Sequence, residues 1–202
     1  MIEHTQMRGQ AYIALSRLLQ RPDENLSEFI SSSEFHSLWL KVEEAYGIQL
    51  PESWKEPLPD LKEWDRMWNI TMGPVKPLAA PIESLYKVWT TDKSCESIIA
   101  NEKGFLKSDW AYHMEELLTS AGFEIPLQFG HCPDHLVLEL EFASLLVEEA
   151  SAEAQIKFAE HHFDWLEDLF EAAKDKNVPK LYQDLYCLCL QYVKADIRWL
   201  LS

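Results

Sequence analysis

Residues 133–150 read PDHLVLELEFASLLVEEA, and this stretch decides the fold class. Proline is well tolerated at the first position of an α-helix, so Pro133 predicts a helix that begins there and runs to about residue 150. Apolar residues cover most sides of that helix instead of one stripe. A helix that is apolar nearly all round is buried at the centre of a bundle. The stretch therefore predicts a helical bundle with a buried central helix.

Apolar residues recur every three or four positions on both sides of this stretch, which predicts further helices. The expected helices include these ranges: Met7–Leu18, 24–32, Phe35–Val42, Leu61–Trp68, 109–121, Ala159–Phe170 and Leu181–Trp199. The residues expected at their ends are Ser33, Asp60 and Ser108 as N-caps and Gly47, Gly73 and Gly122 as stops. No segment alternates convincingly in the manner of a strand, and the chain has only 6 glycines, which tight turns between strands would need. We therefore predict an all-α fold.

The segment GPVKPLAAP at residues 73–81 is rich in proline and predicts a long surface connection. A chain of 202 residues suffices for one large domain or two small ones. We expect a single domain over residues 1–202. Its candidate division is an N-terminal subdomain (1–73), a hinge (74–89) and a C-terminal subdomain (90–202).

The chain is strongly acidic, with 34 acidic and 18 basic residues and a formal net charge of −16. Nucleic acids are bound through clustered Lys and Arg side chains, so the charge argues against a nucleic-acid partner. It argues equally against binding to an anionic membrane surface. An acidic chain suits a basic partner, but the same charge also serves solubility, and composition leaves both interpretations open.

The first residues, MIEHTQMRGQAYIALSRLLQ, lack the basic and then apolar layout of a secretion signal. No apolar run approaches the roughly 20 residues that a membrane-spanning helix needs. We therefore predict a cytoplasmic protein without membrane insertion. The four cysteines form no CxxC pair, and we expect them to be reduced thiols.

Motifs for several kinds of catalytic chemistry are missing from the sequence. No histidine follows a glutamate by three positions, as the di-iron sites of helical bundles require, and there is no HExxH zinc motif. His161, His162 and Asp164 lie close together, but they fall in a helix with a good apolar stripe, so we do not expect a metal there. The sequence also lacks GxGxxG, GxxxxGK[ST] and GxSxG. We predict no catalytic residues, no metal and no cofactor.

The stretch FGHCPDHLVLELEF at residues 129–142 holds the best candidate for a functional site. Asp134 and His135 are expected in the first turn of the central helix, where the helix dipole favours a carboxylate and a neutral histidine. Because the pair faces a connecting segment, we expect it to lie near solvent. An ordinary helix start would have the same pattern, so spacing alone does not decide between the two interpretations.

PDHLVLELEF closely resembles the signature of the TorD family, cytoplasmic chaperones that mature molybdenum redox enzymes. Three further segments resemble family motifs in the same order: PIESLYKVW (81–89), GFLKSDWAYHMEELLTSAGFEIP (104–126) and KFAEHHFDWLEDLFEAA (157–173). Together the motifs cover about residues 77–200. The family usually has Glu-Pro where this chain has His131 and Cys132. This departure bears on which client enzyme the protein serves.

The resemblance implies an all-helical chaperone of the TorD type and no enzyme. Its partner would be the catalytic subunit of a DMSO-, TMAO- or nitrate-reductase-like molybdoenzyme. The chaperone would bind the twin-arginine signal peptide of that subunit and hold it in the cytoplasm until the molybdenum cofactor is inserted. The client, and whether the protein is a monomer, a dimer or a domain-swapped dimer, stay open.

Carried over residue by residue, the resemblance implies a peptide-binding region that contains Pro133, Asp134, His135, Glu83, Tyr86 and Trp89. A twin-arginine signal joins a basic end to an apolar stretch. Asp134 could pair with an arginine, and Trp89 could cover the apolar part. Three of these residues also have a purely structural interpretation. Trp89 would lie in the core, Tyr86 would pack against its neighbours, and Glu83 would hold its own loop by hydrogen bonds to backbone amides.

Two other functions remain as alternatives. A helical scaffold or assembly subunit would bind a folded partner through an aromatic patch and would be indifferent to the signal peptide. A nucleotide-dependent enzyme is the third hypothesis, and the missing phosphate-binding loop disfavours it.

Overall fold

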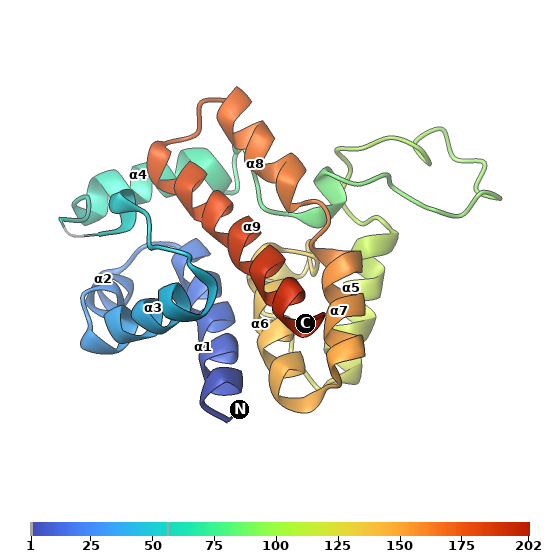
Figure 1. Cartoon of the computed structure of the whole chain (residues 1–202). Helices are drawn as coiled ribbons and strands as arrows, with labels where there is room; N and C mark the ends of the chain where they lie inside the picture. Colours follow the sequence, from blue (N-terminus) through green and yellow to red (C-terminus); the bar gives the residue numbers. More distant parts are fainter. Residues whose placement is uncertain (1, 56) are drawn as a thin grey trace.

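The computed structural model describes residues 2–55 and 57–202 and confirms the all-α fold (Figure 1). Within these residues no β-strand forms, and the only strand-like pairing is an isolated antiparallel bridge between Ile82 and His135. No helix in the described part of the chain is long and apolar enough to cross a bilayer.

The α-helices are α1 (Ile2–Leu19), α2 (Glu24–Ile30), α3 (Ser33–Tyr46), α4 (Leu61–Met72), α5 (Asp109–Ser120), α6 (Leu136–Glu149), α7 (Ala152–His162), α8 (Leu166–Asp175) and α9 (Lys180–Leu200). Three short 3-10 helices are η1 (Glu52–Trp54), η2 (Glu83–Leu85) and η3 (Leu127–Phe129).

Most helix ends follow the sequence signals. Asp60 caps α4 by accepting a hydrogen bond from the Glu63 amide, and Gly47 ends α3 with φ at +68°, a value that favours glycine. The N-cap of α3 is Ser32 and not Ser33, because the Ser32 hydroxyl accepts from the amide three residues later. Ser108 stands at the N-cap position of α5 without making a capping hydrogen bond.

Helix α6 lies at the centre of the molecule, as its sequence predicts. It packs most extensively against α1, and α9 crosses the same core (Figure 1). Its buried residues cover most sides of the helix: Leu136, Val137, Leu138, Glu139, Leu140, Phe142, Ala143, Ser144 and Val147. Two of these, Glu139 and Ser144, are polar, and Glu139 becomes important for the site described below.

The predicted start of the central helix at Pro133 is wrong. α6 begins at Leu136, with His135 as its N-cap. The Glu83 amide donates to the Asp134 carbonyl (3.0 Å), and the Leu136 amide donates to the Pro81 carbonyl (2.9 Å). The backbone here pairs with a neighbouring segment and is therefore held out of helical geometry.

The predicted single helix through Ala159–Phe170 is also wrong. α7 ends at His162 and α8 begins at Leu166. At the break, the Trp165 indole N–H donates to the His162 carbonyl (2.7 Å). In a continuing helix, a backbone amide would have donated to this carbonyl instead. The apolar stripe survives the break because Phe163 and Leu166 are both buried.

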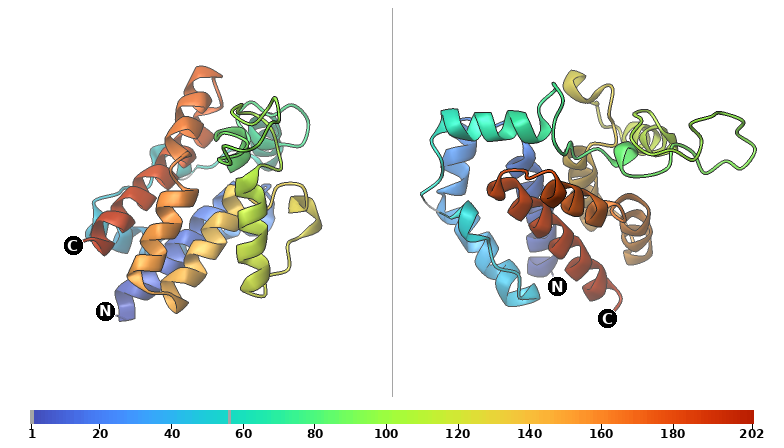
Figure 2. Two further views of the ribbon diagram at one scale, coloured as in Figure 1. Left: turned by 90° about the vertical axis from the view of Figure 1, so that its right-hand side faces the viewer. Right: turned by 90° about the horizontal axis from the view of Figure 1, so that it is seen from above.

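The connection from α4 to α5 contains the predicted hinge. Its first part is fastened to the body, since the Leu78 and Ala79 amides donate to α4 carbonyls and Tyr186 donates to the Ala79 carbonyl (2.8 Å). Its later part, residues 91–107, projects away from the helical body (Figure 2). The division into subdomains around residues 74–89 stays a prediction.

Candidate functional site

The segment 81–87 lies antiparallel to the start of α6 and forms, with residues 133–136, a unit that we call the clasp. Two backbone hydrogen bonds, from Glu83 to Asp134 and from Leu136 to Pro81, join its two halves. Two of the sequence motifs, about fifty residues apart, therefore meet in one place.

Asp134 holds the clasp together. Its Oδ2 accepts hydrogen bonds from the Ser84 amide (2.7 Å) and the Ser84 hydroxyl, which also bonds to Ser108 Oγ (2.6 Å). Burial raises the pKa of Asp134 above its usual value, although the bonds from Ser84 oppose this shift. The expectation that this side chain lies near solvent is wrong, because Asp134 is fully buried.

His135 is the N-cap of α6 and is partly exposed. Its Nδ1 accepts from the Val137 amide (3.2 Å), and its ring lies against Phe129 with centroids 4.8 Å apart. Burial lowers the pKa of His135 to about 3, so the ring is neutral near pH 7. Pro133 is buried beside it.

Glu83 is fully buried and bridges the clasp to α7. Its Oε2 accepts from His162 Nδ1 (2.8 Å), and its Oε1 accepts from Lys87 Nζ (3.1 Å). Glu83 does hold its own loop, but it does so through the side chain of Lys87 and not through backbone amides. His162 in turn bonds through Nε2 to His113 Nδ1 (2.8 Å), so a chain of hydrogen bonds runs from exposed His113 to buried Glu83.

Lys87 is a residue that the sequence analysis missed. Its ammonium group donates to Glu83, to the His161 carbonyl (2.8 Å) and to Asp164 Oδ1 (2.8 Å). It also lies 3.3 Å from the centroid of the Trp110 ring, in cation–π contact. The four-residue spacing from Glu83 was the available signal, since such a pair shares one side of a helical turn.

Glu139 projects from α6 into the same buried region. Neither of its carboxylate oxygens has a hydrogen-bond partner among the described residues. Burial, followed by the nearby charges of Glu83 and Asp134, raises the pKa of Glu139 well above its usual value. The clasp thus rests on a group of buried ionisable side chains.

Tyr86 and Trp89 lie at the outer edge of the clasp and are each half-buried. The Tyr86 ring stacks on Trp165, with centroids 5.3 Å apart, and burial raises the pKa of its hydroxyl. Trp89 stands at the base of the projecting loop, because its amide donates to the Glu102 carbonyl (2.9 Å) and its carbonyl accepts from the Asp109 amide (3.0 Å). Trp89 therefore borders the surface formed by this loop and the start of α5, whereas Tyr86 packs against Trp165.

That surface carries several exposed apolar side chains: Ile98, Phe105, Leu106 and Tyr112. Tyr112, Glu115 and Glu116 are exposed on α5, at spacings that put them on one face of the helix. We call this set of exposed residues, together with Trp89, the loop–α5 surface.

The chain matches the family model of the nitrate reductase delta subunit over residues 58–183. It belongs to this family. No curated protein matches the chain. The matched range contains all four motifs and the whole clasp, and it confirms the resemblance to the TorD-type chaperones.

The nitrate reductase delta subunit family consists of assembly chaperones for respiratory enzymes and not of catalysts. A chaperone role and the absence of catalytic activity follow from this membership. The structural features of the clasp agree with such a role, because they fix loops and expose aromatic side chains. Which residues contact a client stays a prediction.

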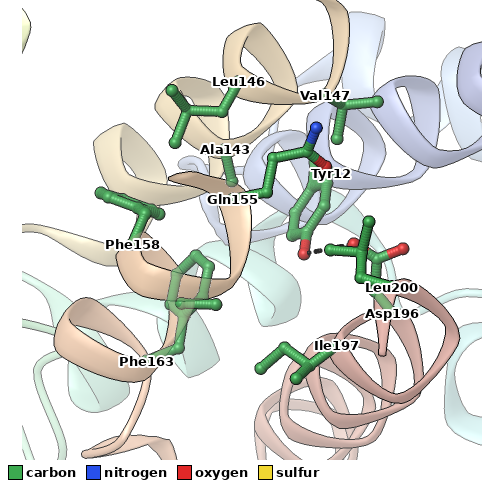
Figure 3. Close-up of a pocket in the computed structure, with 11 residues that line it drawn as sticks. Tyr12, Ala143, Leu146, Val147, Gln155, Phe158, Phe163, Asp196, Ile197 and Leu200 are labelled. Carbon is green, nitrogen blue, oxygen red and sulfur yellow. Dashed lines mark hydrogen bonds between the residues drawn. The ribbon is translucent and has the colours of Figure 1, made fainter. Parts of the chain in front are cut away.

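A separate small cavity lies between α1, α6, α7 and α9 (Figure 3). It has a volume of about 10 Å³, enough for one water molecule, and mostly apolar walls. Its polar corner is Asp196, which accepts from Tyr12 (3.0 Å), from Tyr46 (2.7 Å) and from Arg8 Nε (2.6 Å). All of these groups satisfy one another, so the cavity is part of the core and not a ligand site.

Proposed function

We propose that this delta-subunit-family protein binds the twin-arginine signal peptide of a molybdoenzyme catalytic subunit. It holds the apo subunit in the cytoplasm until the molybdenum cofactor is inserted. The observation that carries the proposal is the clasp, which joins two family motifs directly beside an exposed aromatic surface. A rigid base next to an adaptable apolar surface suits the capture of an unfolded segment.

The burial of each candidate residue suggests its part in binding. Asp134, Glu83 and Pro133 are buried, so they would act by holding the clasp in position. Trp89 and Tyr86, with their half-exposed rings, would line the peptide site. His135 would close it next to the start of α6.

The loop–α5 surface supplies the contacts that the buried carboxylates do not. Phe105, Leu106 and Tyr112 are 42%, 44% and 59% exposed, and they would cover the apolar part of the signal peptide. Glu115 and Glu116 lie beside Tyr112 and would pair with the twin arginines through bidentate hydrogen bonds. The net charge of −16 would speed encounter with a basic peptide at low salt.

Calorimetric titration with the twin-arginine signal peptide of a molybdoenzyme catalytic subunit tests the proposal. We expect Tyr112→Ala to weaken binding at least tenfold, which is about 1.4 kcal/mol. The matched control is Leu40→Ala, because Leu40 is 67% exposed on α3, outside the clasp and the loop–α5 surface. Absence of both heat and any change in tryptophan fluorescence with the wild-type chain would contradict the proposal.

A helical scaffold that binds a folded partner remains the second candidate, and the exposed Ile98 on the projecting loop favours it. This alternative predicts equal binding to the mature enzyme with its signal peptide removed. Comparing the two forms of the client in one pull-down experiment separates the candidates. The oligomeric state, monomer or dimer, can be measured in the same preparations by light scattering.

A further inference from the structure

Glu83, Glu139 and His162 converge from three separate elements: η2, α6 and α7. One carboxylate oxygen from each glutamate and one ring nitrogen of His162 lie within 4.8 Å of one another. All three side chains are fully buried. Two carboxylates and an imidazole form a donor set that zinc accepts in proteins.

The outer partners of these groups are arranged as around a metal. His162 points Nδ1 at the cluster and bonds through Nε2 to His113 (2.8 Å), which orients its ring. Lys87 bonds to Oε1 of Glu83, while Oε2 faces His162 Nδ1 at 2.8 Å, so a metal ion would replace the proton between these two atoms. Ligands in metal sites usually have such a second hydrogen bond on the side away from the ion.

Glu139 is the observation that points to a bound cation. It is fully buried, it faces Glu83 and His162, and neither oxygen has a hydrogen-bond partner among the described residues. Leaving a buried carboxylate without a partner costs several kcal/mol, so such groups are normally paired, protonated or bound to a metal. The ammonium group of Lys87, which lies beside Glu83, is already shared among Glu83, Asp164 and a carbonyl.

The buried charges give the same indication. Glu83, Glu139 and Asp134 are fully buried carboxylates, and Lys87 supplies one positive charge beside them. These three carboxylates therefore share one ammonium group, which Lys87 also directs at Asp164. A divalent cation would balance the remaining carboxylates, as would protons bound to them.

We propose that Glu83, Glu139 and His162 bind one zinc ion that fastens the clasp to α6 and α7. Among divalent metals, zinc binds a mixed nitrogen and oxygen donor set more tightly than manganese or iron(II) does. All three ligands are buried, so the ion would be loaded during folding, and a water molecule would fill the fourth position of its tetrahedral coordination. The proposal is independent of the signal-peptide function, because it concerns the folding of the clasp and not its client.

The test is to unfold the full chain, refold it with or without ZnCl₂, remove loose metal by gel filtration, and measure bound zinc and the melting temperature. Two matched pairs of variants serve as site and control: Glu139→Gln with Glu141→Gln on α6, and His162→Gln with His161→Gln on α7. Each control residue lies near its partner in sequence but outside the cluster.

We expect stoichiometric zinc and a higher melting temperature in the wild type and both controls, and loss of both effects in the two site variants. Refolding with CoCl₂ gives a second readout that needs no variant, because cobalt bound at such a site absorbs visible light. Substoichiometric zinc with no cobalt bands would overturn the proposal and leave protons as the balancing charge. Equal zinc in all variants would overturn it as well, since the metal would then lie elsewhere.

Discussion

His135 shows how one side chain of the clasp combines capping and burial. As a neutral ring it accepts the hydrogen bond that caps α6, and a protonated ring could no longer accept it. Its folded pKa of about 3 lies below the ordinary value of 6.5. The folded state therefore gains stability above pH 6.5, and this gain is lost as the pH falls towards 3.

Replacing His135 with asparagine should make the protein less sensitive to acid. Asparagine also caps helices well but does not titrate. Below pH 6.5 the wild type should lose up to about 1.4 kcal/mol per pH unit relative to His135→Asn, an upper bound because the residue is partly exposed. Urea unfolding at pH 7 and pH 5 measures the difference, and equal losses in both proteins would contradict the assignment.

Asp134 should be needed for the stability of the clasp through its hydrogen bonds and not through its charge. Asp134→Ala leaves the buried Ser84 amide without an acceptor, which costs about 1–3 kcal/mol. Asp134→Asn keeps an acceptor oxygen at the same place and should cost less. Urea unfolding of both variants checks the order, and a reversed order would show that the carboxylate charge itself is required.

At the scale of helices, the sequence predicted which helices exist better than it predicted where they begin and end. The apolar residues of α6 and α9 recur with a strong helical period, so the local sequence is enough to predict that both helices exist. The start of α6 depends instead on backbone pairing with the 81–87 segment, which is distant in sequence. At the break between α7 and α8, the Trp165 indole bonds to the His162 carbonyl, a contact that the apolar period of the sequence does not reveal.

A polar network joins α1, α3 and α9 inside the apolar core. Asp196 is 2% exposed and accepts from Arg8, Tyr12 and Tyr46. Removing one partner of a buried ion pair leaves the other charge uncompensated, so Asp196→Ala should destabilise the fold by about 3–5 kcal/mol.

A matched control for this network is Glu167→Ala, which breaks the exposed ion pair with Lys194 and should cost at most about 1 kcal/mol. Chemical unfolding followed by circular dichroism measures both variants. Similar losses in the two would show that the buried network adds nothing beyond a surface pair.

At the scale of the whole molecule, the family motifs predicted which segments meet but not which atoms are exposed. The motifs at 81–89 and 129–142 meet in the clasp, as a shared site requires. Burial of Asp134 and Glu83 could not be foreseen, because it depends on packing between α6, α7 and the connecting segment. The Glu83–Glu139–His162 cluster escaped the sequence for the same reason, since its members come from three separate segments.

The projecting loop between η2 and α5 should adapt to a bound peptide. Residues 91–107 extend from the helical body (Figure 2), and the side chains of Ile98, Phe105 and Leu106 are exposed. A segment with few buried contacts is a low-stability part of a fold and can adapt to a partner. We expect a bound signal peptide to order this loop against α5.

Hydrogen–deuterium exchange of the chain, with and without a twin-arginine signal peptide, measures whether the clasp and the loop–α5 surface form the binding site. We expect slower exchange in residues 81–89 and 98–116, with little change in α2 and α3. Unchanged exchange in those two ranges at a saturating peptide concentration, or protection confined to α1 and α3, would contradict the proposed binding site.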